Sequence, residues 1–361
     1  MKALDTKHNS IEFFRFLFAL QIAVYHTWDY FEAPVFGGGG YIAVDFFFIL
    51  SGFFMYRHIC IGNKEGVKLC PSKDTAAYMI SRIKRIYLDY LLAFLSQFLL
   101  LNCIVEKNCL KQTILNLLNS CWTLLLINEA GIGPIIYNGA AGWYLSALLI
   151  ASYLVYYLAV KFPDTFIRYL APIEMIGIYS FFYNRFGHLE IATEFCNTGG
   201  TLRAIAGISL GCICYHIFVF IDNFEYTKMG KFLFDFIELS LIIMIMWCEK
   251  RGFTQNDFIC VLLFGLLIPL LYSQESHFTK LFQRPIFGFL GKISFLFFLN
   301  HRFILILFIQ YIPGLTYVQM LPIYLLGTFI FSVGMYILSD KIRSRMISVC
   351  EKIKKTLCLE A

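Results

Sequence analysis

Apolar runs long enough to cross a membrane recur along the whole chain, and they limit what it can fold into. About 20 mainly apolar residues in a helix span the roughly 30 Å hydrocarbon core of a bilayer. Ten segments of about this length are 11–31, 41–59, 86–105, 142–160, 166–183, 202–221, 232–248, 257–273, 287–309 and 319–339. We therefore predict an all-α fold, a polytopic membrane bundle of about ten transmembrane helices.

The composition supports this class and defines one domain. The chain is 59% hydrophobic and only 15% charged, which excludes an ordinary soluble core. A further apolar run, 113–127, is shorter and carries Asn116, Asn119 and Ser120, so we expect an additional interfacial or re-entrant segment there. No internal repeat or linker divides the chain. We predict a single transmembrane domain over 1–340 and a short basic tail over 341–361.

The distribution of positive charge predicts the topology. With the N-terminus inside, the inside segments hold 21 of the 30 Lys and Arg residues and the outside segments hold five. This asymmetry follows the positive-inside rule and places both termini in the cytoplasm. If 113–127 crossed fully, the basic tail would face outward. In such a protein the net charge of +6 does not indicate nucleic acid, and we expect membrane lipids as partners.

Polar residues inside the first apolar segment give the first candidate site. Glu12, Arg15 and His26 are expensive in hydrocarbon, so they need a partner or a function. In a helix, the eleven steps from Arg15 to His26 return to nearly the same face about 16 Å further along the axis. The resulting polar stripe would face protein or water. The alternative is an arginine that reaches the headgroups and a histidine that makes only a hydrogen bond between helices.

Three cations stand just before the third segment, in SRIKRIYLDY. Arg82, Lys84 and Arg85 at the start of a helix would oppose its macrodipole, so they are not explained by helix stability. They either set the topology or form an anion site at the inner membrane face, suited to the phosphates of a nucleotide-bearing donor.

Other polar residues lie at membrane depth in later segments. Asp45 in the second segment needs a nearby cation or histidine. Arg203 precedes Gly207 and Gly211, which would let neighbouring helices approach closely. His301 lies between two further polar residues, an arrangement that packing does not explain, although a hydrogen-bond cluster between helices is an alternative. Twelve cysteines form no CxxC pair and no zinc-ligand spacing, so no metal is expected.

In their order, these motifs resemble those of acyltransferase family 3, multi-spanning bacterial membrane proteins that O-acylate cell-surface carbohydrates with a cytoplasmic acyl-CoA. The resemblance spans nearly the whole chain. It rests on Glu12, Arg15 and His26, then Gly40, Val44, Asp45, Phe46, Phe47, Ser51 and Gly52, then Arg82 and Arg85, then Trp143 and Leu145, then Arg203 and Gly211, and finally Gly291, Lys292, Ser294 and His301.

The resemblance implies an O-acetyltransferase of the bacterial cytoplasmic (inner) membrane. Its donor would be acetyl-CoA, and its acceptor a hydroxyl of an exopolysaccharide, a capsule or another surface or lipid-linked glycan. His26 would be the general base or carry the acyl group, since a histidine near neutral pKa suits both roles. We expect catalytic roles for His26, Arg15 and Asp45, cofactor binding by Arg82, Arg85 and Arg203, and supporting or substrate contacts from Glu12, Trp143 and His301.

Two departures from the family pattern weaken inference about the acceptor. Many relatives that acetylate polysaccharides have a glutamate five residues after the tryptophan, where this chain has Leu148. A hydrolase-like C-terminal domain of some relatives has no counterpart here. Transfer of a succinyl or longer acyl group is an alternative, and so is a glycan transporter or flippase, because charged residues within spans also line transport pathways.

Overall fold

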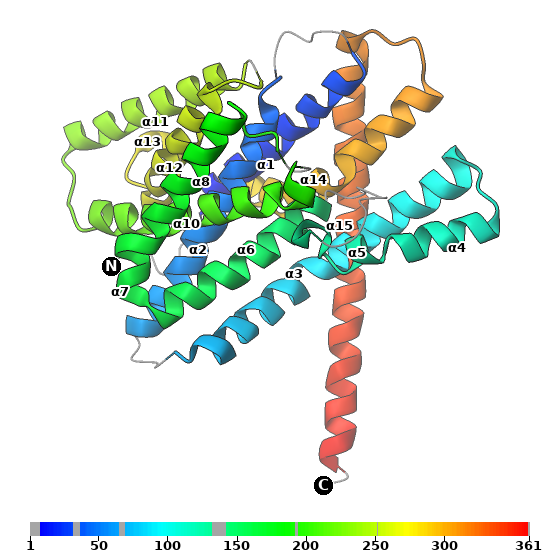
Figure 1. The fold of residues 1–361 in the computed structure, drawn as a ribbon, viewed down its shortest axis with the longest axis horizontal. Helices are drawn as coiled ribbons and strands as arrows, with labels where there is room; N and C mark the ends of the chain where they lie inside the picture. Colours follow the sequence, from blue (N-terminus) through cyan, green and yellow to red (C-terminus); the bar gives the residue numbers. More distant parts are fainter. Residues whose placement is uncertain are drawn as a thin grey trace.

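A computed structural model describes residues 8–31, 37–64, 69–131, 142–191, 194–250 and 252–359, and every regular element in these ranges is helical (Figure 1). This confirms the predicted all-α fold. The helices of 15 residues or more are α1 Asn9–Tyr25, α2 Ala43–Lys64, α3 Pro71–Leu100, α6 Gly142–Lys161, α8 Ala171–Arg185, α10 Gly199–Asp222, α11 Lys228–Cys248, α12 Asn256–Ser273, α14 Pro285–Tyr311 and α15 Tyr317–Leu359.

Shorter helical elements connect or extend these helices. They are η1 His26–Asp29, η2 Gly40–Ile42, η3 Leu101–Val105, α4 Leu110–Asn119, α5 Cys121–Leu124, η4 Asn128–Ala130, α7 Pro163–Thr165, η6 Phe166–Leu170, α9 Glu194–Asn197 and α13 His277–Leu281. Each of the ten expected membrane segments overlaps one of the long helices. Seven of the described helices are long and apolar enough to cross a membrane, so the number ten is not confirmed.

The three remaining long helices are less suited to crossing alone. α1 has 17 residues and α8 has 15, whereas α11 carries Lys231, Asp235 and Glu238 within its apolar sequence. The expected segment 113–127 forms α4 and α5. Two hydroxyls of α3 tie α5 back to that helix, because Tyr87 donates to Leu124 O at 3.2 Å and Tyr90 to Thr123 O at 2.6 Å. The interfacial or re-entrant position of segment 113–127 stays a prediction.

The beginning of α3 corrects one argument from the sequence. The helix starts at Pro71, a residue favoured at the first helical position because it has no N–H to leave unpaired. Arg82 and Arg85 therefore lie more than two turns inside the helix, where the macrodipole no longer acts on them. The argument that these cations oppose a helix start was wrong, and their position must be explained by what they contact.

Close packing of α2 against α10 forms the centre of the bundle. A Cβ atom on Gly52 would collide with the backbone oxygen of Ile208, and one on Gly211 would collide with that of Ile49. Only glycine permits two backbones to approach this closely. The predicted role of Gly211 in close helix packing is thus confirmed, and Gly207 packs in the same interface, against Phe48.

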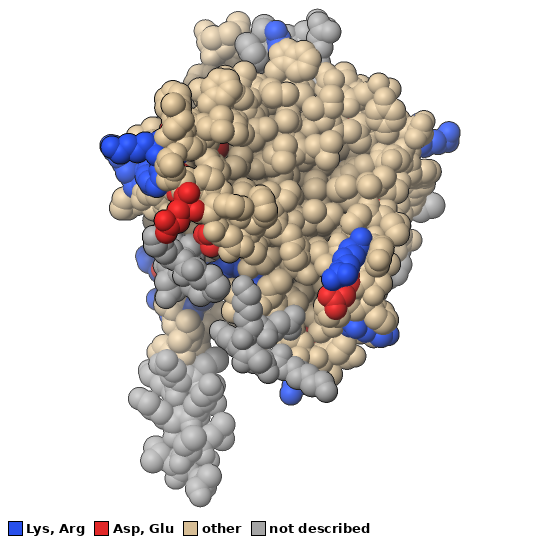
Figure 2. Space-filling view, turned by 90° about the vertical axis from the view of Figure 1, so that its left-hand side faces the viewer, with Lys and Arg blue, Asp and Glu red and all other residues tan. Residues whose placement is uncertain are grey.

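The outer surface is suited to lipid. α11 exposes large apolar side chains, among them Phe232, Phe236, Ile243 and Trp247. Figure 2 shows the face that lies on the left of Figure 1, and most of it is free of charged side chains. A patch of this extent marks a membrane or partner surface. α15 continues without a break past residue 340 and projects beyond the other helices toward the C-terminus (Figure 1).

Candidate functional site

A cavity of about 1160 Å³ opens near the amino-terminal end of α1, and we call it the large cavity. It is lined by residues of α1, α2, α3, α6, α14 and α15. Its walls carry six cationic side chains and three carboxylates, which are Arg15, Arg57, Arg82, Arg85, Lys292 and Arg343 against Glu12, Asp74 and Asp89. The cavity exceeds the roughly 300–1,000 Å³ typical of small-molecule sites, and the excess of positive charge suits an anion.

Glu12 and Arg15 form an ion pair one turn apart on the wall of this cavity. Nη1 of Arg15 lies 2.9 Å from Oε2 and 3.1 Å from Oε1 of Glu12, and the side chains are 31% and 27% exposed. Gly291 of α14 makes room for the pair, since a Cβ atom there would collide with Oε2 of Glu12. This contact gives the Gly291 of the late G-K-I-S sequence a physical role.

Arg82 of α3 is held at the same cavity by a side chain of α2 and one of its own helix. Arg82 donates to Ser51 Oγ of α2 at 2.9 Å and to the Tyr78 hydroxyl at 2.7 Å. Nη2 of Arg343, on α15, lies 3.4 Å from Asp89 and from the backbone oxygen of Arg85. Arg82 is thereby oriented along the wall, whereas the charge of Arg343 is partly offset by Asp89.

His8, which precedes α1, also lines the large cavity. It stacks on Tyr272 with ring centroids 3.9 Å apart. Burial, and then the charge of Arg57, lower its pKa to about 4. His8 is therefore neutral at physiological pH and adds no charge to the cavity.

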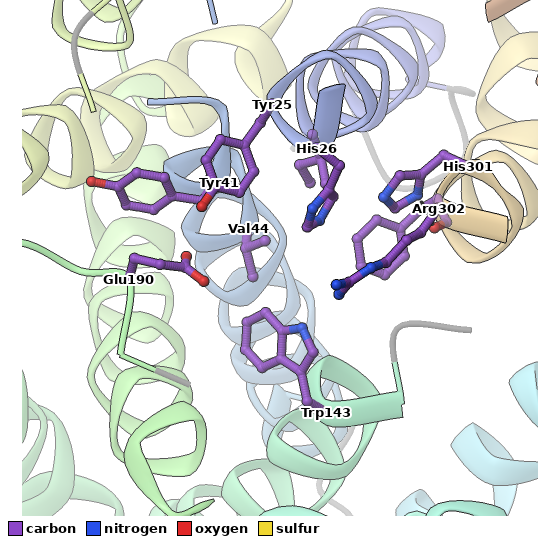
Figure 3. Close-up of a pocket in the computed structure, with 10 residues that line it drawn as sticks. Tyr25, His26, Tyr41, Val44, Trp143, Glu190, His301 and Arg302 are labelled. Carbon is purple, nitrogen blue, oxygen red and sulfur yellow. Dashed lines mark hydrogen bonds between the residues drawn. The ribbon is translucent and has the colours of Figure 1, made fainter. Parts of the chain in front are cut away.

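A second, smaller cavity, which we call the histidine pocket, lies at the other end of α1. It has a volume of about 40 Å³ and is lined by Ile22, Tyr25, His26, Tyr41, Val44, Trp143, Glu190, Phe298, His301 and Arg302. In Figure 3 the two imidazoles lie side by side, the Arg302 guanidinium lies between them and the Trp143 indole, and the Glu190 carboxylate points toward the same space. The ring centroids of His26 and His301 are 5.0 Å apart, with an interplanar angle of 25°.

Local structure positions both histidines. α1 ends at Tyr25, and His26 begins the tighter turn η1, in which the Thr27 hydroxyl donates to Val24 O at 2.6 Å. The expected helix over 11–31 is thus shorter, and His26 stands at its break. Nδ1 of His301 lies 2.5 Å from Phe298 O. Because a carbonyl oxygen only accepts, Nδ1 of His301 carries a proton, and in the neutral imidazole Nε2 is then the acceptor.

Asp45 and Arg203 form a second ion pair, in the interior. Both side chains are fully buried, with Nη2 of Arg203 2.6 Å from Oδ2 of Asp45 and Nε at 3.0 Å from the same oxygen. Arg203 also donates to Tyr41 O at 2.9 Å, and the Tyr179 hydroxyl donates to Asp45 at 3.3 Å. The predicted need of Asp45 for a nearby cation is confirmed.

The structure thus divides the residues singled out by the sequence into three places. Glu12, Arg15, Arg82 and Arg85 line the large cavity, His26, Trp143 and His301 line the histidine pocket, and Asp45 and Arg203 pair between helices. Sequence reasoning gave no role to Glu190 or Arg302. Arg302 was signalled by its position beside His301, whereas Glu190 lies in the loop before α9, where a single carboxylate gives no signal.

Comparison with known proteins identifies the family. A family model described as an acyltransferase domain matches residues 8–338. The chain belongs to acyltransferase family 3. As a member of this family with helices suited to membrane crossing, it is a membrane acyltransferase. No curated protein and no solved structure matches the chain.

For an acyltransferase, the two cavities offer complementary chemistry. The large cavity has cations for an anionic donor, and the histidine pocket has imidazole nitrogens that can take a proton from a nucleophile. Among the described residues, no group of three or more histidine, cysteine or acidic side chains is placed to hold a metal ion.

Proposed function

We propose that the protein transfers an acetyl group from acetyl-CoA to a hydroxyl of an exopolysaccharide, a capsule or a lipid-linked glycan. The observation that carries the proposal is the pairing of a large cationic cavity with a small histidine pocket along the length of α1. A coenzyme A phosphate would bind Arg82 and Arg85, and Arg15 would hold the donor nearer the thioester.

The histidine pocket would perform the chemistry. As the acceptor oxygen attacks the thioester carbonyl, a C–O bond forms and His26 takes the hydroxyl proton. Collapse of the tetrahedral intermediate then breaks the C–S bond, and the leaving thiolate takes that proton. Arg302, which lines the pocket, would stabilise the oxyanion. A transient acyl group on His26 is the alternative route, and it would deliver the same products.

The size of the pocket supports acetyl over longer acyl groups. A volume of about 40 Å³ holds a few water molecules, each of which needs about 10–15 Å³, and this space suits a two-carbon group better than succinyl. The acceptor sugar is larger than this space, so only its reacting hydroxyl would enter the pocket, beside Trp143 and Glu190. We assign Asp45 and Arg203 to a supporting role, since neither is among the residues lining the two cavities.

The orientation in the membrane follows from this assignment. The large cavity would face the cytoplasm, where acetyl-CoA is made, and both termini would be cytoplasmic. The histidine pocket would then receive the acceptor from the outer side of the bacterial cytoplasmic membrane. This arrangement agrees with the distribution of Lys and Arg along the chain.

The test is transfer of labelled acetyl from acetyl-CoA to surface glycan in membranes. Wild type, His26→Ala and, as a control, His216→Ala are compared at matched expression, because His216 is an exposed histidine of α10. Label is expected with wild type and the control and is expected to fall at least about 100-fold with His26→Ala. Normal transfer by His26→Ala would contradict the assignment. Loss of surface glycan itself in cells without the protein would instead favour a transporter.

A further inference from the structure

Three aromatic rings separate the large cavity from the histidine pocket. Phe298 is the residue that lines both spaces. Phe47 and Tyr144 line the large cavity beside it. Val44, one helical turn before Phe47, and Trp143, directly before Tyr144, line the histidine pocket. We call Phe47, Tyr144 and Phe298 the aromatic partition.

The partition is a closed triangle contributed by three helices. The ring centroids of Tyr144 and Phe298 are 5.2 Å apart, and Phe47 lies 6.3 Å from each of them. These are contact distances for aromatic rings. α2, α6 and α14 supply one ring each, so the rings pack together where the two cavities meet.

The proposed function requires a passage at this point. In the proposed reaction the donor binds beside Arg15, whereas the general base is His26. This histidine follows the end of α1, eleven residues or about 16 Å beyond Arg15 along the helix axis. The thioester of a donor held in the large cavity therefore has to pass the partition before it meets the histidines. Phe298 stands directly at the entrance, because its ring centroid is 5.8 Å from that of His301.

We propose that Phe298 determines which acyl groups this enzyme transfers, by gating a passage from the large cavity into the histidine pocket; this inference rests on the proposed acyl transfer. A rotation of the Phe298 side chain opens the passage. A two-carbon acyl group fits beyond the gate, whereas a longer chain clashes with the ring.

The side chain of Phe298 can be changed without disturbing the histidine beside it. Its backbone oxygen accepts the hydrogen bond from Nδ1 of His301, and that bond does not depend on the side chain. Phe303 on the same helix supplies a matched control. It is 2% exposed, against 6% for Phe298, packs against Phe331 and is not among the residues lining the two cavities.

The first experiment compares acetyl-CoA and butyryl-CoA as donors for wild type, Phe298→Ala and Phe303→Ala. We expect Phe298→Ala to raise the ratio of butyryl to acetyl transfer by about 10-fold or more, since each methylene in a tight pocket is worth about 10–200-fold. Phe303→Ala should leave the ratio at the wild-type value. An unchanged ratio in Phe298→Ala overturns the proposal. If Phe298→Ala does not fold, Phe298→Leu is tested in the same way.

The second experiment needs no activity and so separates the two proposals. Val44→Cys places a thiol in the histidine pocket, and a charged methanethiosulfonate is added on the side of the large cavity. Labelling of the introduced thiol, read by peptide mass spectrometry, should be at least about 10-fold faster with Phe298→Ala than with Phe298 intact, in line with the discrimination expected of a tight passage. Equal rates overturn the gate. If wild type transferred neither acyl group, but labelling were still faster with Phe298→Ala, the proposed function would be rejected and the gate would stand.

Discussion

Two arginine–carboxylate pairs of this protein have similar N–O distances and differ in burial. Arg15 and Glu12 lie one turn apart on α1, and about 30% of each side chain is exposed to the large cavity. Arg203 and Asp45 come from α10 and α2 and are fully buried. Both pairs have an N–O distance below 3.0 Å, at 2.9 and 2.6 Å.

The difference in burial separates a binding group from a structural one. A partly exposed pair gains little stability, about 0–1 kcal/mol, because water competes for both charges. Its charges also remain available to a ligand. A buried pair is satisfied only by its partners, so removing one charge leaves the other stranded. We therefore expect the buried pair to control folding and the exposed pair to control transfer.

The largest expected effect is that of Asp45→Ala on stability. Arg203 would keep its charge in the interior, with Tyr41 O as a remaining hydrogen-bond acceptor and the Glu190 carboxylate 4.0 Å from its Nη1. Breaking a buried ion pair in this way costs about 3–5 kcal/mol. We expect a much lower melting temperature in detergent, measured by fluorescence-detected size exclusion after heating.

A double variant tests the reason for that loss. Asp45→Leu combined with Arg203→Met removes both charges and keeps apolar volume, so it should melt well above Asp45→Ala. If Asp45→Ala melted like wild type, the pair would contribute no stability and the contrast with Arg15 and Glu12 would fail.

Arg15→Ala should have the smaller effect on folding and a clear effect on transfer. Loss of the exposed pair is expected to cost at most about 1 kcal/mol of stability. A hydrogen bond to a charged ligand is worth about 1.5–3 kcal/mol, so kcat/KM for acetyl-CoA should fall about 10- to 100-fold. Steady-state kinetics on membranes with titrated acetyl-CoA would measure it.

The split between KM and kcat identifies what Arg15 does. A rise in KM alone indicates that it holds the donor, whereas a fall in kcat alone indicates that it acts in the transition state. Arg15→Lys keeps the charge and should recover part of the rate. Wild-type kinetics in Arg15→Ala would remove the exposed pair from the site.

The two pairs also show what a sequence reveals. The Glu12–Arg15 pair is local, so helix periodicity was enough to place both on one face, and long apolar runs were enough to predict the helices around them. The partner of Asp45 is 158 residues away, and nothing in the local sequence connects them. Glu190 reaches the histidine pocket from a loop, and no proline or glycine in the sequence marks the break after Tyr25 that positions His26.

A third carboxylate, Glu129, sharpens the comparison because it is buried without a cation. It lies in η4, between the membrane-crossing helices, with its side chain fully buried, and no ion pair joins it to a cation among the described residues. Burial raises its pKa to about 8, and a contact with the backbone of Gly200 works in the opposite direction. Glu129 is therefore largely protonated at neutral pH.

This shift predicts how stability depends on pH. Between the ordinary pKa of about 4.3 and the folded value, the unfolded state loses the Glu129 proton while the folded state keeps it. The contribution of this group to the free energy of unfolding thus decreases as pH rises toward 8, by at most about 1.4 kcal/mol per pH unit, and levels off above it. Glu129→Gln, which stays neutral, should melt with less dependence on pH between 5 and 8 than wild type in detergent. Identical slopes for the two proteins would show that Glu129 is ionised in the folded state and has a charge partner after all.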